Sequence, residues 1–109
     1  MAWLVRDGEV LATLEVAESR HDRRKGLLGR DGIDGALLLR PARSVHTIGM
    51  RFPIDVVYVD EGFVVLELVT MSRMRIGVPR MKAKAVIEAE AGTFAHWNLA
   101  PGDQLEITG

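Results

Sequence analysis

The sequence predicts a mainly β fold of the α+β class: a compact, mostly antiparallel sheet of about seven strands that curls into a barrel or a sandwich, with one or two short helices. Three observations predict it. Short runs rich in β-branched and aromatic residues recur along the chain, turn residues separate them, and strands do not alternate with long helical patterns. With 109 residues, the chain is long enough for one hydrophobic core, so we expect a single domain over residues 1–109.

Two hairpins are predicted. Strands over residues 3–6 and 9–16 flank an Asp-Gly pair, which tolerates positive φ and favours a tight turn. Strands over residues 54–59 and 63–71 join at an Asp-Glu-Gly turn, and we expect this second hairpin to form the centre of the sheet. Strict alternation along its second strand predicts that odd-numbered residues from 63 to 69 share one face.

The remaining elements are shorter. Ser19 is a favourable N-cap residue and predicts a short, mostly polar helix that runs to Gly29 and lies on the surface of the sheet. An Ala-Pro-Gly-Asp sequence near the C-terminus predicts a type II turn. The other predicted elements are a strand buried on both faces (36–39), a further strand (85–90), a helical turn (92–97) and a closing strand (104–108).

Charge is unevenly distributed along the chain, although the formal net charge is −1. Residues 20–51 carry eight basic side chains and three acidic ones. Residues 73–84 carry five basic side chains and no acidic one, and this segment is predicted to be a basic, exposed loop. Eleven of the 14 basic residues are arginine, which favours bidentate recognition of carboxylate or phosphate. The alternative to ligand recognition is that the basic side chains of these two segments form surface ion pairs with the acidic segments of the chain.

Several classes of function are not supported. The chain has no cysteine, which excludes disulfides and thiol chemistry. It has no apolar run of the ~20 residues that a membrane span needs, and its start does not resemble a signal peptide, so we expect a cytoplasmic protein without a membrane partner. The three histidines lack metal-binding spacing and no nucleotide-binding motif is present, so no metal or cofactor is expected. Nucleic acid is not expected either, because few aromatic residues accompany the basic ones.

The densest polar cluster is residues 40–55, an irregular segment between two apolar strands. Loops held by a rigid scaffold are a common place for binding and catalytic groups. In an enzyme, His46 would be a general base, Asp55 would orient it, and Arg40, Arg43 or Arg51 would hold an anionic substrate. In a structural interpretation, His46 instead satisfies loop carbonyls, and Asp55 caps backbone N–H groups or pairs with Arg51.

Four ordered motifs resemble the prokaryotic family catalogued as domain of unknown function number one hundred and ninety-two. They are Gly26 to Arg30, His46 to Tyr58, Val86 to Gly92, and Pro101 to Asp103. The resemblance implies a small, mainly β domain and brings no established activity, cofactor or substrate. Family members commonly have Phe-Trp-Met-x-Asn-Thr where this chain has residues 45–50, and that departure directs attention to the histidine and threonine found there.

Our leading hypothesis is a small non-enzymatic binding or accessory domain with a polar, Arg-rich cleft for a small anionic or polar ligand. One alternative is a hydrolase or lyase that uses His46 and Asp55, and another is a protein-interaction module that uses a sheet edge or the basic loop. The residues predicted to build the cleft are Arg30, Arg40, Arg43, His46, Thr47, Arg51, Asp55 and Glu88.

Overall fold

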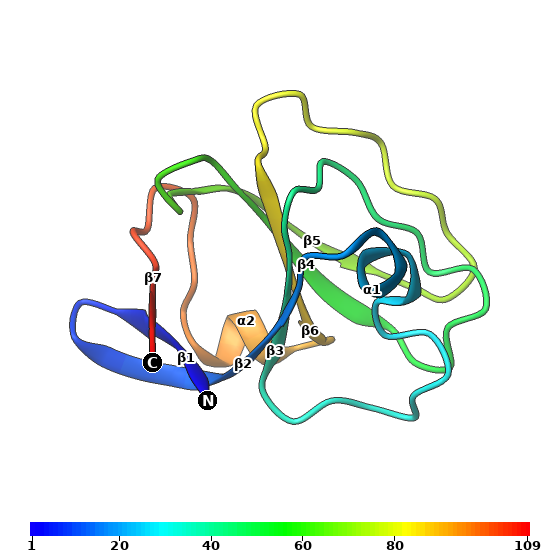
Figure 1. Cartoon of the computed structure of the whole chain (residues 1–109), viewed down its shortest axis with the longest axis horizontal. Coiled ribbons are helices and arrows are strands. Elements are labelled where there is room, and N and C mark those ends of the chain that lie inside the picture. Colours follow the sequence, from blue (N-terminus) through cyan, green and yellow to red (C-terminus); the bar gives the residue numbers. More distant parts are fainter.

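The computed structural model describes residues 1–109 and contains one curled sheet of seven strands in the order β5-β4-β6-β3-β2-β1-β7 (Figure 1). All neighbouring strands are antiparallel except β2 and β3, which are parallel. The predicted class, a mainly β and mostly antiparallel fold, is therefore confirmed. The elements are β1 (Ala2–Arg6), β2 (Glu9–Ala17), α1 (Arg20–Lys25), β3 (Ala36–Leu39), β4 (Ile54–Val59), β5 (Val65–Met71), β6 (Ala85–Glu90), α2 (Thr93–His96) and β7 (Glu106–Thr108).

The first hairpin forms as predicted. Asp7 and Gly8 have φ values of 51° and 78°, and Arg6 pairs with Glu9 directly across the turn. The C-terminal part of β2 continues beyond β1 and pairs in parallel with β3. This single long strand therefore joins the N-terminal hairpin to the middle of the sheet.

The second hairpin forms, but its predicted position is wrong. β5 lies at an edge of the sheet, because β6 inserts between β4 and β3 and pairs with both. The predicted alternation along β5 is also wrong: Val65 packs in one core and Val69 against the other. A register shift between Tyr58 and Val59 places Leu66 in a bulge, and one extra residue reverses the faces of those that follow.

The two edges of the sheet meet at one end, which gives it a half-barrel shape. Val64 and Gln104 form an isolated bridge between the segments that precede β5 and β7, and the Leu105 amide donates to the Phe63 carbonyl at 3.0 Å. The predicted type II turn supports this closure, since Gly102 has a φ of 92° and the Asp103 amide donates to the Ala100 carbonyl at 3.1 Å.

Each face of the sheet carries its own hydrophobic core. One core includes Leu38, Ile87 and Phe94 and is covered partly by α2, while the other includes Leu39 and Val56 and lies beneath irregular chain. Every residue of β3 is buried, which confirms the expectation of a strand buried on both faces. Figure 1 shows α1 and the long connections gathered on one side of the molecule. Neither of the two short helices has the length or the apolar composition that a membrane-spanning helix needs.

The long connection between β5 and β6 pairs with the segment that follows β3. The Gly77 amide donates to the Val45 carbonyl and the Thr47 amide to the Arg75 carbonyl, both at 2.8 Å, and His46 forms a bridge with Ile76. We call residues 43–47 with residues 74–80 the loop ribbon. It holds the segment after β3 in a fixed position beside α1.

Candidate functional site

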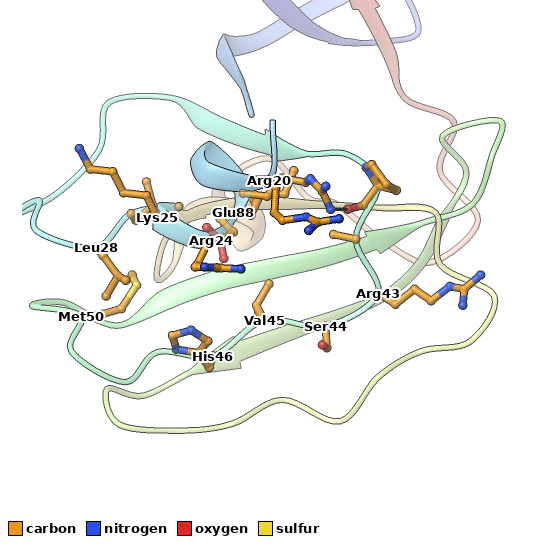
Figure 2. Close-up of a pocket in the computed structure, with 16 residues that line it drawn as sticks. Arg20, Arg24, Lys25, Leu28, Arg43, Ser44, Val45, His46, Met50 and Glu88 are labelled. Carbon is orange, nitrogen blue, oxygen red and sulfur yellow. Dashed lines mark hydrogen bonds between the residues drawn. The ribbon is translucent and has the colours of Figure 1, made fainter. Parts of the chain in front are cut away.

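A cavity of about 360 Å³ lies between α1 and the segment that follows β3 (Figure 2). Helix α1 supplies one wall, and residues 41–46 supply the other. Leu39 of β3 and Glu88 of β6 reach the cavity from the sheet beneath. The site is therefore built from three parts of the chain that are distant in sequence.

The wall formed by α1 is almost entirely basic. The Ser19 side chain caps the helix by accepting from the Asp22 amide at 3.0 Å, and none of the helical residues is buried. The helix thus has no apolar face to pack, and its basic side chains are left at the surface of the cavity. Those that line it are Arg20, Arg23, Arg24 and Lys25.

The helix is also tied to the opposite wall. The Arg23 guanidinium donates to the Glu18 carbonyl at 3.2 Å and to the Pro41 carbonyl at 3.0 Å. In Figure 2, Arg20 and Arg24 extend from α1, His46 lies on the facing wall, and the Arg43 side chain extends outward from the rim. Arg23 therefore has a positioning role, while its neighbours remain available to a ligand.

The floor of the cavity contains the Glu88 carboxyl group. β6 is a central strand, so Glu88 pairs with Val56 on one side and Leu37 on the other, and its exposed fraction is only 3%. Its Oε1 atom has no hydrogen-bond partner in the protein. Burial raises the pKa of this carboxyl to about 7, because the charged form loses its hydration.

Gly26 allows the backbone to pass close above that carboxyl. Its φ of 48° and ψ of −124° end α1, and a Cβ atom at this position would lie 3.5 Å from Glu88 Oε1. The predicted helix to Gly29 is thus shorter than expected, because Gly26 terminates it. A glycine here lets the helix end lie over the floor without a side chain filling the site.

The basic residues around the cavity form no ion pairs. The five ion pairs in the structure are Arg6–Asp103, Arg30–Glu15, Arg40–Glu18, Arg51–Asp31 and Arg80–Glu67, all involving residues outside the cavity lining. The only acidic side chain that lines the cavity is Glu88. The side chains that line the cavity therefore carry a net positive charge.

Three of the eight residues predicted to build the cleft line this cavity: Arg43, His46 and Glu88. The predicted Arg30 forms a bidentate pair with Glu15, at 2.8 and 2.9 Å, that lowers the pKa of that carboxyl. The predicted Arg40 and Arg51 bind carboxylates elsewhere, those of Glu18 and Asp31. These three arginines act as surface ion pairs, which was the alternative interpretation of the charge blocks.

The other two predicted residues are buried and fully bonded. Thr47 Oγ1 donates to the Ser72 carbonyl at 2.6 Å and accepts from the Arg75 amide at 2.9 Å, so it fixes the loop ribbon. Asp55 accepts from the Thr70 hydroxyl at 2.7 Å and from two backbone amides at the start of α2, at 2.9 and 3.0 Å. Both side chains support the fold around them.

The structure does not bring His46 and Asp55 together. Asp55 pairs with Ala89 and Val56 with Glu88, so the side chains of Asp55 and Glu88 lie on opposite faces of the sheet. His46 lines the cavity on the Glu88 face. No three histidine or carboxylate side chains converge in a way that could hold a metal ion, the combination of His46, Asp55 and Glu88 included.

Sequence reasoning missed the four basic residues of α1. The signal was present, because residues 20–25 include four basic residues and no apolar one, followed by glycine. Such a pattern predicts a short, mostly polar helix on the surface of the sheet, but it does not by itself indicate a binding site. What the sequence does not contain is the long-range packing that places this helix above β6.

Comparisons with known proteins agree with the fold. The family model DUF192, described as "Uncharacterized ACR", matches residues 2–107. A UPF0127 protein of Pyrococcus horikoshii is 29% identical over 105 residues, which cover 92% of this chain and 88% of that protein. A UPF0127 protein of Pyrococcus furiosus is 33% identical over 63 residues, so the match spans 58% of this chain and only 54% of that relative.

A solved structure has the same architecture. It is the crystal structure of a protein of unknown function from Novosphingobium aromaticivorans, with a TM-score of 0.81 at 18% sequence identity. The match covers 96% of this chain and 82% of that one. At this level of identity the similarity establishes the fold alone.

Replacing Asp55 by alanine is expected to lower the free energy of unfolding by about 3 kcal/mol, because one buried and two partly buried hydrogen bonds lose their acceptor. Chemical denaturation measures this loss. Asp31→Ala is the control: its exposed pair with Arg51 is expected to contribute at most about 1 kcal/mol. Equal effects of the two substitutions would contradict the structural role of Asp55.

Glu88 is expected to make stability fall as pH rises. Its native pKa of about 7 exceeds the ordinary value of 4.5 that it has when unfolded, so between these pH values the native state retains a proton that the unfolded state releases. The free energy of unfolding should therefore drop by about 3 kcal/mol across that range relative to Glu88→Gln. Denaturant titrations of both proteins from pH 4 to pH 8 measure the difference, and parallel curves would contradict it.

Proposed function

The chain belongs to the uncharacterised family DUF192, and we propose that it is a non-enzymatic binding domain whose cavity takes a small anionic ligand. One observation carries the proposal: basic side chains without acidic partners surround a cavity whose only acidic group is buried at the floor. We keep the cytoplasm as the expected location, because a chain without cysteine is compatible with a reducing compartment.

The walls suit an anion for electrostatic and geometric reasons. Arg20 and Arg24 each present a planar set of donors, and neither is committed to a carboxylate of the protein. Hydrogen bonds between a guanidinium and an anion are stronger than those between neutral groups. A ligand that supplies the missing negative charge would therefore bind where the protein leaves these donors free.

The geometry supports binding over the alternative of a hydrolase or lyase. Such an enzyme was expected to use His46 with Asp55 as its orienting carboxylate, and these groups lie on different faces of the sheet. Asp55 is also occupied by three donors. His46 is left at the cavity wall, where its ring N–H would donate to a bound anion.

Calorimetric titration with inorganic phosphate tests the proposal. We expect binding that weakens with added salt and that falls at least tenfold in Arg24→Ala and in Arg20→Ala, since a charge-assisted hydrogen bond contributes about 1.5–3 kcal/mol. Arg51→Ala is the matched control, because this arginine is exposed, outside the cavity and paired with Asp31. Equal losses in all three variants, or no binding to the unmodified protein, would contradict the proposal.

A second candidate function, protein interaction, is favoured by one surface. The loop between β5 and β6 carries exposed apolar side chains among basic ones: Met74, Ile76, Val78 and Met81 are 57%, 76%, 70% and 70% exposed. Large apolar residues grouped in this way often mark interaction sites. The matching partner would be an acidic protein segment that also presents apolar side chains.

Fluorescence titration with peptides of alternating glutamate and leucine tests this second function. Binding is expected to weaken about tenfold when Ile76 and Val78 are both replaced by serine, because the exposed apolar contact is lost. Val10→Ser is the control, since Val10 is 55% exposed but lies on the N-terminal hairpin. Binding that is unchanged by the double substitution would exclude this loop as the contact.

A further inference from the structure

We propose that the ligand of the cavity is the phosphate monoester of a small polyol, bound with its phosphate between the basic walls and a hydroxyl group against Glu88. This inference rests on the proposed function and names the chemical class of its ligand. Two independent features carry it: the basic residues at the walls and the unpartnered carboxyl at the floor.

The walls match a phosphate monoester better than a single carboxylate. Arg20 and Arg24 lie on one side, His46 lies on the other, and Lys25 and Arg43 extend from the rim. A phosphate monoester carries up to two negative charges and three terminal oxygens, so it can accept from both walls at once. A carboxylate has one charge and two oxygens and would leave more of these donors unpaired.

The floor requires a different chemical group. Glu88 Oε1 is buried and unpartnered, although most buried polar atoms in proteins have a hydrogen-bond partner. A second anion would be repelled by the carboxylate form, and a cation would have to pass the basic walls. A neutral hydroxyl matches both constraints, because it donates to a carboxylate oxygen and accepts from a protonated carboxyl.

The burial of Glu88 also argues against a purely structural role. Its carboxyl caps no helix and forms no ion pair, whereas Asp55 on the adjacent strand accepts three hydrogen bonds. A buried carboxyl without partners lowers stability. Gly26 then places backbone rather than a side chain above it. The floor thus has a polar group whose bonding the protein leaves incomplete.

The size of the cavity sets the scale of the ligand. Its volume of about 360 Å³ is at the lower end of the range for small-molecule sites. A sugar monophosphate of three to six carbons suits such a volume, while a dinucleotide does not. The phosphate would remain near the mouth, where the basic side chains lie, and the polyol would reach toward β6.

Calorimetry with glucose 6-phosphate, glycerol 3-phosphate, inorganic phosphate and glucose tests this assignment. At least one of the two phosphate esters is expected to bind ten times more tightly than inorganic phosphate, and glucose more weakly than either. Glu88→Leu should abolish the advantage of the ester while it changes the affinity for inorganic phosphate less than twofold. Glu88→Gln, which keeps a donor and an acceptor, should retain most of the advantage.

The control is Glu90→Gln, two residues further along β6 and outside the cavity lining, which should change none of these affinities. Thermal unfolding of each variant separates loss of binding from loss of folding, and Glu88→Met, which also removes both carboxyl oxygens, decides the outcome if Glu88→Leu does not fold. If inorganic phosphate and both esters bind equally and no Glu88 variant alters this, the inference is overturned while the proposed function stands. If none of the three phosphates binds, both are overturned.

Discussion

The pairing of β6 with both β3 and β4 is the constraint on which the rest of the structure depends. It joins the hairpin of β4 and β5 to the part of the sheet formed by β3, β2, β1 and β7. It also buries β6 on both faces, with Val86 in one core and Ile87 in the other. It also fixes where a polar residue on this strand must go. Because side chains alternate along a strand, Glu88 follows Val86 onto the face beneath α1, and the cavity forms above it.

The two buried carboxyl groups of the chain show how position decides role. Asp55 and Glu88 are on neighbouring strands and are each 3% exposed. Asp55 faces the start of α2, where backbone amides lack helical partners, and it satisfies them. Glu88 faces α1 near its C-terminal end, where backbone carbonyls rather than amides are left free, so the helix backbone offers it no donors. The same chemical group is structural on one face and available to a ligand on the other.

Local signals in the sequence were sufficient for much of the fold. The Asp-Gly pair specified the first hairpin, and the apolar run at residues 36–39 indicated a strand buried on both faces. The insertion of β6 was not predictable in this way, because it depends on pairing between distant segments. The bulge at Leu66 was missed since one residue reverses the faces without altering the apolar pattern. For the site, residue type identified Glu88 and His46, but the basic residues of α1 depended on where the helix packs.

The stability that is lost when Glu88 ionises connects the fold to the proposed binding. A native pKa of about 7 corresponds to about 3 kcal/mol of lost stability once the carboxyl is ionised, a considerable share of the roughly 5–15 kcal/mol that a domain possesses. A hydroxyl that bonds to this carboxyl would recover part of the loss only in the bound state. For the ligand that we propose, the incomplete bonding of the floor would therefore add to affinity, which a carboxyl already satisfied by the protein would not do.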